Sequence, residues 1–204
     1  MIEAWHFLPA SRMTRYSNEY VYPGCMLKAQ GEIAMCNNGM HASTAALDAL
    51  RYAPGPILCR VRMHGRIVHG ADKVVAEARE CLWMADATET LHHFAVLQAL
   101  SVAHLWDMPD YVRTYLMRGG DKDMQLAARN AAWAFRDAVW SKCRPTRTAP
   151  WSAARAAGCA IDFTLDAPLA AYAVATEAKW LACREFKQRA AESQFERLAC
   201  MLAP

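Results

Sequence analysis

Histidine and hydroxyl side chains gather in one short stretch of the chain, Met40 to Thr44. His41 lies next to Ser43 and Thr44 at a predicted junction between a strand and a helix, where side chains are often presented to ligands. A hydroxyl nucleophile needs a base within hydrogen-bond reach and a third group that orients the base. Ser43 can instead serve as the N-cap of the following helix. The pattern therefore favours a helix start over a hydrolase site.

Cysteine and histidine are numerous enough to raise the question of a metal site. Cys36 and His41 flank an Asn-Asn-Gly turn signal, and Cys59, His64 and His69 follow further along. No pair has the short spacing typical of zinc fingers or zinc ribbons. The eight cysteines are dispersed without a Cys-x-x-Cys pair, as free thiols in a reducing compartment are. We expect no metal, no cofactor and no disulfide framework.

Arginine and tryptophan recur at helical spacing in the second half. Arg129 and Trp133 are repeated seven residues later by Arg136 and Trp140, so the tryptophans share one stripe with an arginine one turn from each. A proline-bearing loop without acidic residues then carries more cations beside Trp151. Protein interfaces are rich in these two residue types. The predicted partner-binding residues are Arg129, Trp133, Arg136, Trp140, Arg144, Arg147, Trp151 and Arg155.

The same loop leaves nucleic-acid binding open as an alternative. Cations beside exposed aromatic rings bind single strands, and residues 142–155 hold four basic groups. A dedicated nucleic-acid binder usually has a larger basic footprint. We therefore rank a protein partner above a single-stranded nucleic acid.

Composition indicates a globular protein that lies outside the membrane. The chain has 204 residues, of which 54% are hydrophobic and 10% aromatic, with a net charge of +3. Disordered and collagen-like chains do not have this composition. The uncharged run from Thr90 to Trp106 is too short to span a bilayer and contains three histidines. The N-terminus lacks a secretory signal, so the expected location is cytoplasmic.

The chain divides by composition near residue 120. Residues 1–120 hold all seven histidines and balance eleven basic against eleven acidic groups, whereas residues 121–204 are rich in alanine and carry the net charge of +3. Before residue 86 the apolar runs are short, and Ile57 to Met63 alternates as a strand with one apolar face. His64-Gly65 predicts a hairpin turn into Arg66–His69. Further short strands are expected at Ala4–Leu8, Tyr20–Tyr22, Cys25–Lys28, Glu32–Met35 and Lys73–Ala85, and one short helix at Thr44–Tyr52.

Helical signals dominate from Asp86 onward. Asp86 and Glu89 form a capping-box pattern before a broad apolar face that ends near Trp106. Pro109 and Gly119-Gly120 bound a second helix, and Asp121 opens a third that reaches about Trp140. Further helices are expected at Trp151–Ala160 and Pro168–Leu202. The predicted fold class is α+β: a small mixed or antiparallel sheet module with one short helix, at 1–85, followed by an all-α region at 86–204.

Several segments together resemble a family of uncharacterised proteins encoded by bacteriophages and prophages. They are the Ala-Trp-His-Phe-Leu start, the Cys-x-x-Gly-x-His-Ala-Ser core at 36–43, Tyr52-Ala-Pro-Gly, Asp72-Lys73-Val-Val and Leu105-Trp106-Asp107. In that family a small N-terminal domain precedes helices rich in alanine, arginine and tryptophan. The resemblance implies a phage or prophage origin, hence the cytoplasm of a host cell, and an order of domains. It does not imply an activity.

The histidine-bearing first strand and the His-Ala-Ser-Thr strand end also resemble the NAD-binding core of ADP-ribosyltransferase-like proteins. That resemblance implies candidate catalytic residues at His6, His41 and Ser43, with Glu77 or Glu80 as the glutamate of a later strand. Our preferred expectation is nevertheless an accessory protein that binds a macromolecule, such as a component of a host defence system, without catalysis. The NAD-dependent enzyme and the single-strand binder are the alternatives.

Overall fold

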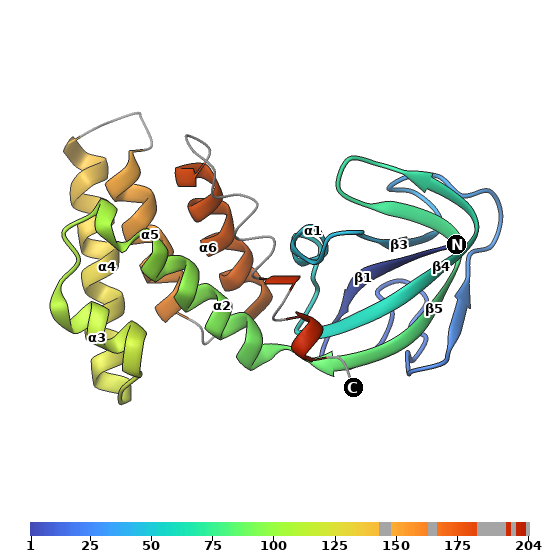
Figure 1. The fold of residues 1–204 in the computed structure, drawn as a ribbon, viewed down its shortest axis with the longest axis horizontal. Coiled ribbons are helices and arrows are strands. Elements are labelled where there is room, and N and C mark those ends of the chain that lie inside the picture. The colour runs from blue at the N-terminus through green and yellow to red at the C-terminus, as the bar shows by residue number, and fades with distance from the viewer. Residues whose placement is uncertain (143–147, 163–166, 183–194, 197–198, 203–204) are drawn as a thin grey trace. The chain divides into compact units, whose positions relative to one another are not determined.

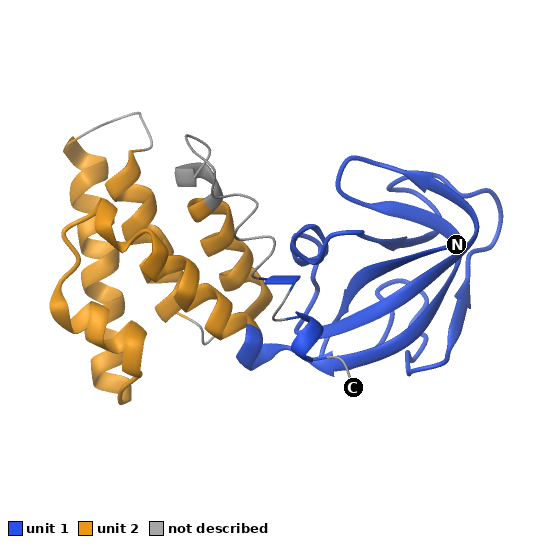
Figure 2. Ribbon diagram, viewed as in Figure 1, with its two compact units in different colours: residues 1–90, 192–204 blue, residues 91–191 orange. Residues whose placement is uncertain are grey.

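The computed structural model describes residues 1–142, 148–162, 167–182, 195–196 and 199–202 (Figure 1). Residues 1–90 and 192–204 form one compact unit, called unit 1 below, and residues 91–191 form a second, unit 2 (Figure 2). Unit 1 is built on an antiparallel sheet and unit 2 on helices. The predicted α+β fold class, with a sheet module before a helical region, is confirmed.

The sheet of unit 1 has five antiparallel strands. β1 (Ile2–Leu8) pairs with β4 (Ile57–His69), and β4 pairs along its length with β5 (Val74–Asp86). The other edge of β5 is shared by two short strands, β2 (Met26–Lys28) at residues 78–80 and β3 (Met40–Ala42) at residues 74–76. The predicted strands at 4–8, 25–28, 57–63 and 73–85 are thus present. Tyr20 and Ala34 form only single bridges, so 20–22 and 32–35 are not strands.

A single bridge joins the two edges of this sheet. Trp5 donates its N–H to the backbone oxygen of Ser43 (2.7 Å), and Ser43 donates back to Trp5 (2.9 Å). The free edge of β1 therefore meets the end of β3, and β1, β4, β5 and β3 enclose a common interior. Small and apolar side chains fill it, among them Ala4, Cys59, Val61, Met63 and Ala76, and each is at least 98% buried.

The predicted hairpin turn at His64-Gly65 is wrong. β4 continues through both residues to His69, with a register shift between His64 and Ile67. Gly65 takes the left-handed conformation (φ +74°), which glycine adopts readily, and so inserts a β-bulge rather than a turn. The chain reverses after His69 instead, where Gly70 donates its N–H to Lys73 O (2.8 Å).

The predicted role of Ser43 as a helix N-cap is also wrong. α1 (Ala46–Leu50) begins two residues later than expected, behind Ala45, and no side chain of the preceding residues caps it. Ser43 is instead held in the sheet by its bridge to Trp5. The Ala46 N–H donates to the Glu196 carboxylate (2.7 Å), which lies 150 residues further along the chain. A carboxylate at a helix start accepts a hydrogen bond from an otherwise unpaired N–H, and its negative charge interacts favourably with the helix dipole.

Unit 2 is a stack of helices that follows the expected order. They are α2 (Thr88–Ser101), which begins in unit 1, a short 3₁₀ turn (Ala103–Leu105), α3 (Asp110–Arg118), α4 (Lys122–Lys142), α5 (Ala149–Ile161) and α6 (Ala167–Ala182). α5 packs against both α4 and α6, and α3 packs against α4. Gly119 closes α3 with φ +71°, and Asp121 Oδ1 accepts the Met124 N–H (2.8 Å) at the start of α4. Of the helix expected at 168–202, α6 covers the part up to Ala182, and residues 195–196 and 199–201 are also helical; 183–194 and 197–198 lie outside the described residues.

Alanine and glycine on α5 allow α4 to approach closely. A Cβ atom added to Gly158 would lie 2.9 Å from the Trp133 ring, so the indole rests directly on the glycine backbone. Trp106 packs against Phe135 nearby along α4 (ring centroids 5.0 Å apart). Trp133 is therefore a packing residue of unit 2.

We predict that Gly158→Ala lowers the free energy of unfolding by about 1–3 kcal/mol, because the new methyl group overlaps the indole in a packed interface. Urea denaturation followed by circular dichroism measures the change. The double variant Gly158→Ala/Trp133→Phe is the control, since a smaller ring makes room for the methyl group. A loss in the double variant equal to the sum of the two single losses would contradict this packing.

Candidate functional site

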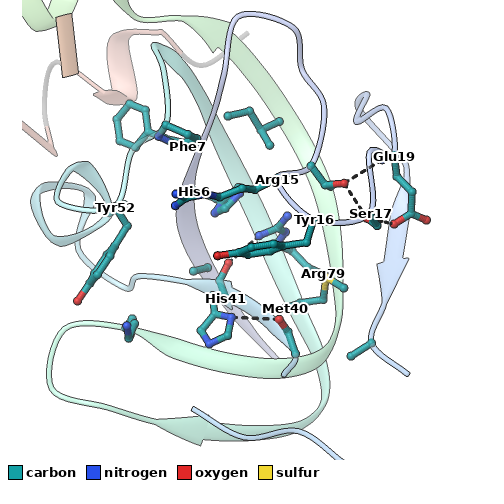
Figure 3. A pocket seen from close by; sticks show the side chains of 18 of the residues that line it. His6, Phe7, Arg15, Tyr16, Ser17, Glu19, Met40, His41, Tyr52 and Arg79 are labelled. Atoms are coloured by element: carbon teal, nitrogen blue, oxygen red, sulfur yellow. Dashed lines mark hydrogen bonds between the residues drawn. The ribbon is translucent and has the colours of Figure 1, made fainter. Parts of the chain in front are cut away.

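A pocket of about 940 Å³ opens in unit 1 (Figure 3). Its walls come from β1, from residues 13–19, from the turn before β3, and from the end of α1. The volume is in the range of pockets that bind small molecules. His6, Tyr16, His41 and Arg79 reach this space from different segments of the chain, as Figure 3 shows.

Arg79 is the most deeply buried charge in the pocket wall. It lies on β5 opposite Met63 of β4, on the interior side of the sheet, and only 7% of the residue is exposed. Its Nη1 donates to the backbone oxygen of His41 (2.7 Å). No carboxylate among the described residues pairs with it. Burial lowers the pKa of Arg79, but a guanidinium keeps its charge in proteins.

Two neutral imidazoles lie beside this charge. His41 Nε2 accepts the Cys36 N–H (3.1 Å), so Nδ1 carries the proton and donates to Gly39 O (3.0 Å). Burial lowers the pKa of His41 and outweighs the bond to Gly39; the charges of Lys73 and Arg79 act in the same direction as burial. Burial lowers the pKa of His6 well below its ordinary value, helped by Arg79 and His41.

The His6 ring has an open hydrogen-bonding capacity. It makes no hydrogen bond to any residue that the structure describes, and it lines the pocket. A neutral imidazole offers one donor and one acceptor. A bound ligand could therefore use both nitrogens of His6.

Cations predominate around the rest of the pocket. Arg15, Lys28 and Lys73 line it together with Arg79, whereas Glu19 is the one carboxylate among the lining residues. A hydrogen bond to the Cys36 thiol is the main cause that raises the pKa of Lys73. With both histidines neutral, the charged lining groups sum to +3, so the pocket favours an anion.

Aromatic rings line the outer part of the pocket. The segment around Tyr16 is shaped by hydrogen bonds among Thr14, Ser17 and Glu19, and the Tyr16 side chain itself is 90% exposed. The Tyr52 side chain is held in place by its hydroxyl, which donates a hydrogen bond to the Asp72 carboxylate (2.6 Å). This hydrogen bond is the main cause that raises the pKa of Tyr52 and lowers the pKa of Asp72. The Tyr16 ring can stack on a planar ligand, whereas Lys73 Nζ already lies over the Tyr52 ring, 4.3 Å from its centroid.

Three of the four catalytic candidates meet at this pocket. His6, His41 and Ser43 all line it, Ser43 with little exposure. Glu77 does not line it; its carboxylate accepts the Arg66 N–H (3.1 Å) beside Gly65. The other glutamate considered, Glu80, contacts His64 Nε2 (3.0 Å) and Arg62 (3.5 Å). β5 therefore presents a guanidinium to the pocket where the resemblance implied a carboxylate.

Arg79 is a pocket residue that was not predicted from the sequence. Glu77 and Arg79 are two residues apart and would share a face of a regular strand. Glu77 lies opposite the bulge at Gly65 and is exposed, whereas Arg79 lies opposite Met63 and is buried. An arginine between Ala78 and Cys81 in a strand of small residues is the signal that could have revealed it.

The residues considered for a metal do not form a site. Cys36 and His41 share a backbone hydrogen bond, whereas Cys59 is buried beside Cys81, and His64 bonds to Glu80. Within the described part of the chain, no three His, Cys, Asp or Glu side chains are placed to hold a metal ion. None of the helices described there is long and apolar enough to cross a membrane.

Six of the eight predicted partner-binding residues lie in the described part of unit 2, and they contact one another or their neighbours. Arg129 pairs with Asp162 (3.2 Å), Arg136 pairs with Asp137 and lies over the Trp133 ring, and Arg155 pairs with the buried Glu177. Trp140 and Trp151 pack together with ring centroids 5.8 Å apart, and 38% of Trp140 is exposed. Arg144 and Arg147 lie outside the described residues.

Comparison with known proteins finds a domain that covers much of the pocket lining but not His6. Residues 11–93 match the model of DUF7666, a domain of unknown function. The match covers less than half of the chain but includes Tyr16, His41, Tyr52 and Arg79. No curated protein and no solved structure matches the chain.

Because the pKa values of His6 and His41 are lowered in the folded chain, we predict that its free energy of unfolding decreases in acid. The unfolded chain takes up protons near pH 6.5, whereas the folded chain resists protonation at His6 and His41, so stability is lost as the pH falls below about 7. Each unit of pKa difference corresponds to about 1.4 kcal/mol. We expect a lower Tm at pH 5.5 than at pH 7.5, and a smaller decrease for His6→Gln. His69→Gln, which removes an exposed histidine, should leave the decrease unchanged; equal decreases in all three proteins would contradict the assignment.

Proposed function

We propose that unit 1 binds a nucleotide-type ligand of the NAD class in the pocket. The observation that carries the proposal is the convergence of His6, His41 and Arg79 on one cationic space lined by tyrosines. Nucleotides combine a negative charge, hydroxyl groups and a flat ring. Cationic, neutral hydrogen-bonding and aromatic side chains recognise these three features respectively.

The site supports binding better than ADP-ribosyl transfer. The transferase resemblance implied a glutamate from a later strand. Glu77 instead accepts the Arg66 N–H at the bulge, and Glu80 pairs with His64 and Arg62. Glu19 lines the pocket and already accepts a hydrogen bond from the Ser17 hydroxyl (2.5 Å). We therefore propose that the ligand is held without transfer of its ADP-ribosyl group. Such a module would sense or sequester a nucleotide.

Isothermal titration of the full chain with NAD tests this proposal. We expect saturable binding, and an affinity about tenfold weaker for Tyr16→Ala, since a base stacked on an aromatic ring contributes about 1–3 kcal/mol. Tyr22→Ala is the control, because Tyr22 is also an exposed tyrosine of unit 1 but does not line the pocket.

Labelled NAD distinguishes binding from catalysis. After incubation with the chain and a cell lysate, we expect the label to be recovered as intact NAD. Transfer of label to protein, or consumption of NAD that depends on His6, would show that the ADP-ribosyltransferase alternative is correct. Absence of any NAD binding would refute the proposal itself.

A second candidate function is binding of a protein partner by unit 2. The exposed edge of Trp140, packed on Trp151 beside Arg136 and Arg155, is the observation that favours it. In this proposal the chain is a phage-type accessory protein, and its partner is a component of a host defence system. Binding of single-stranded nucleic acid by residues 142–155 depends largely on residues outside the described part, and it stays a prediction of the sequence.

We predict that Trp140→Ala weakens such a partner interaction by about 2 kcal/mol if the ring lies at the centre of the interface. A quantitative pull-down that follows one partner band measures the loss. Tyr111→Ala removes another exposed ring of unit 2, on α3, and should retain the band. Equal recovery with all three proteins would exclude this edge as the binding surface.

A further inference from the structure

The inner part of the pocket holds a charge that the protein does not neutralise. Arg79 has five N–H donors, and one of its nitrogens bonds to the backbone of His41. A buried arginine is ordinarily paired with a carboxylate, because an isolated charge away from water is costly. No such carboxylate lies against Arg79 in the described residues. The remaining donors face a space that is open to a ligand.

His6 provides the second open group at the same place. It comes from β1, on the opposite side of the interior from β5, and the charge of Arg79 is one cause of its lowered pKa. The ring makes no hydrogen bond within the described part of unit 1. A buried arginine and a half-buried histidine on separate strands thus leave hydrogen-bonding capacity directed at one space.

The charge of the pocket decides which kind of anion fits. The lining side chains sum to +3, from four cations and Glu19. One carboxylate brings a single negative charge and two acceptor oxygens. A pyrophosphate group brings at least two charges and enough oxygens to bond with Arg79, His6 and an ammonium group at once.

We infer that Arg79 and His6 form a pyrophosphate subsite, which anchors the diphosphate of a nucleotide at the inner end of the pocket. The inference rests on the proposed nucleotide site and specifies the group by which the ligand is held. Arg79 binds the phosphoryl oxygens through its free N–H groups. His6 donates one further hydrogen bond, and Lys28 and Lys73 supply the balancing charge from the rim.

The alternative role of Arg79 is structural, as a link from β5 to the backbone of β3. The two roles predict opposite effects of removing the charge. If Arg79 is a receptor, Arg79→Met removes a buried charge without a counterion, so the Tm of the free protein is unchanged or higher while anion binding is lost. If Arg79 is a structural link, Arg79→Met lowers the Tm.

Titration of the full chain with inorganic pyrophosphate tests the subsite. We expect saturable binding and a rise in Tm on addition of pyrophosphate. We also expect at least tenfold weaker binding of sodium succinate, which is a dianion without phosphoryl oxygens. Arg79→Met and Arg79→Lys should weaken pyrophosphate binding at least 50-fold and tenfold respectively, because lysine keeps the charge but not the forked donors. Arg66→Met is the matched control: it removes an exposed arginine of β4 that does not line the pocket.

The wild-type titration keeps the inference falsifiable if the Arg79 variants do not fold. Equal affinity for pyrophosphate and succinate, or no pyrophosphate binding, would overturn the subsite. Binding of NAD that is insensitive to Arg79→Lys and to competing pyrophosphate would retain the proposed function and overturn the subsite alone. Binding of pyrophosphate through Arg79 without binding of NAD would retain the subsite and overturn the proposed function.

Discussion

Two backbone hydrogen bonds between Trp5 and Ser43 connect the edges of the sheet in unit 1. His6 follows Trp5, and His41 precedes Ser43 by two residues, so the bridge fixes both imidazoles relative to one another. The same closure gives the sheet an interior in which side chains from β1, β3 and β5 face each other. An open sheet would expose Arg79 to water and leave it as an ordinary surface charge. The pocket and its electrostatics therefore depend on this closure.

Burial sets the protonation of the pocket histidines. Desolvation is the main cause that lowers the pKa of both His6 and His41, and the positive charge of Arg79 acts in the same direction. Both imidazoles are consequently neutral and can donate or accept. A stable fold would gain by replacing Arg79 with an apolar residue, because the neighbouring side chains are small and apolar. Residues that lower the stability of the fold and have no evident structural role are expected at functional sites.

The sequence allowed prediction of the features that depend on local patterns. Alternation from Ile57 to Met63 predicted β4, and Pro109, Gly119 and Asp121 marked helix ends correctly, because propensity and capping act within a few residues. The features that failed depend on distant partners. Ser43 is paired with Trp5 rather than capping a helix, and Glu196 caps α1 from the far end of the chain. Arg79 was missed because alternation along β5 shows which residues share a face of the strand but not which charged side chain on that face is buried: Glu77 is exposed and Arg79 is not.

The arginines and tryptophans of unit 2 also have contacts that depend on residues distant in the sequence. The spacing of Arg129, Trp133, Arg136 and Trp140 correctly placed these four residues along one helix, α4. Spacing does not tell whether an indole meets a partner or a glycine of the next helix. Trp133 meets Gly158, and Arg155 meets the buried Glu177, so part of this composition is explained by close packing of alanine-rich helices. Small residues bring the backbones together, and long side chains must then fill the gaps or cross them. This packing does not explain why the edge of the Trp140 ring is exposed. In unit 1, the residue that packing does not explain is the charged Arg79. An unneutralised buried charge requires a counterion, whereas single exposed rings are common on protein surfaces. For this reason the pocket of unit 1 carries the stronger functional argument.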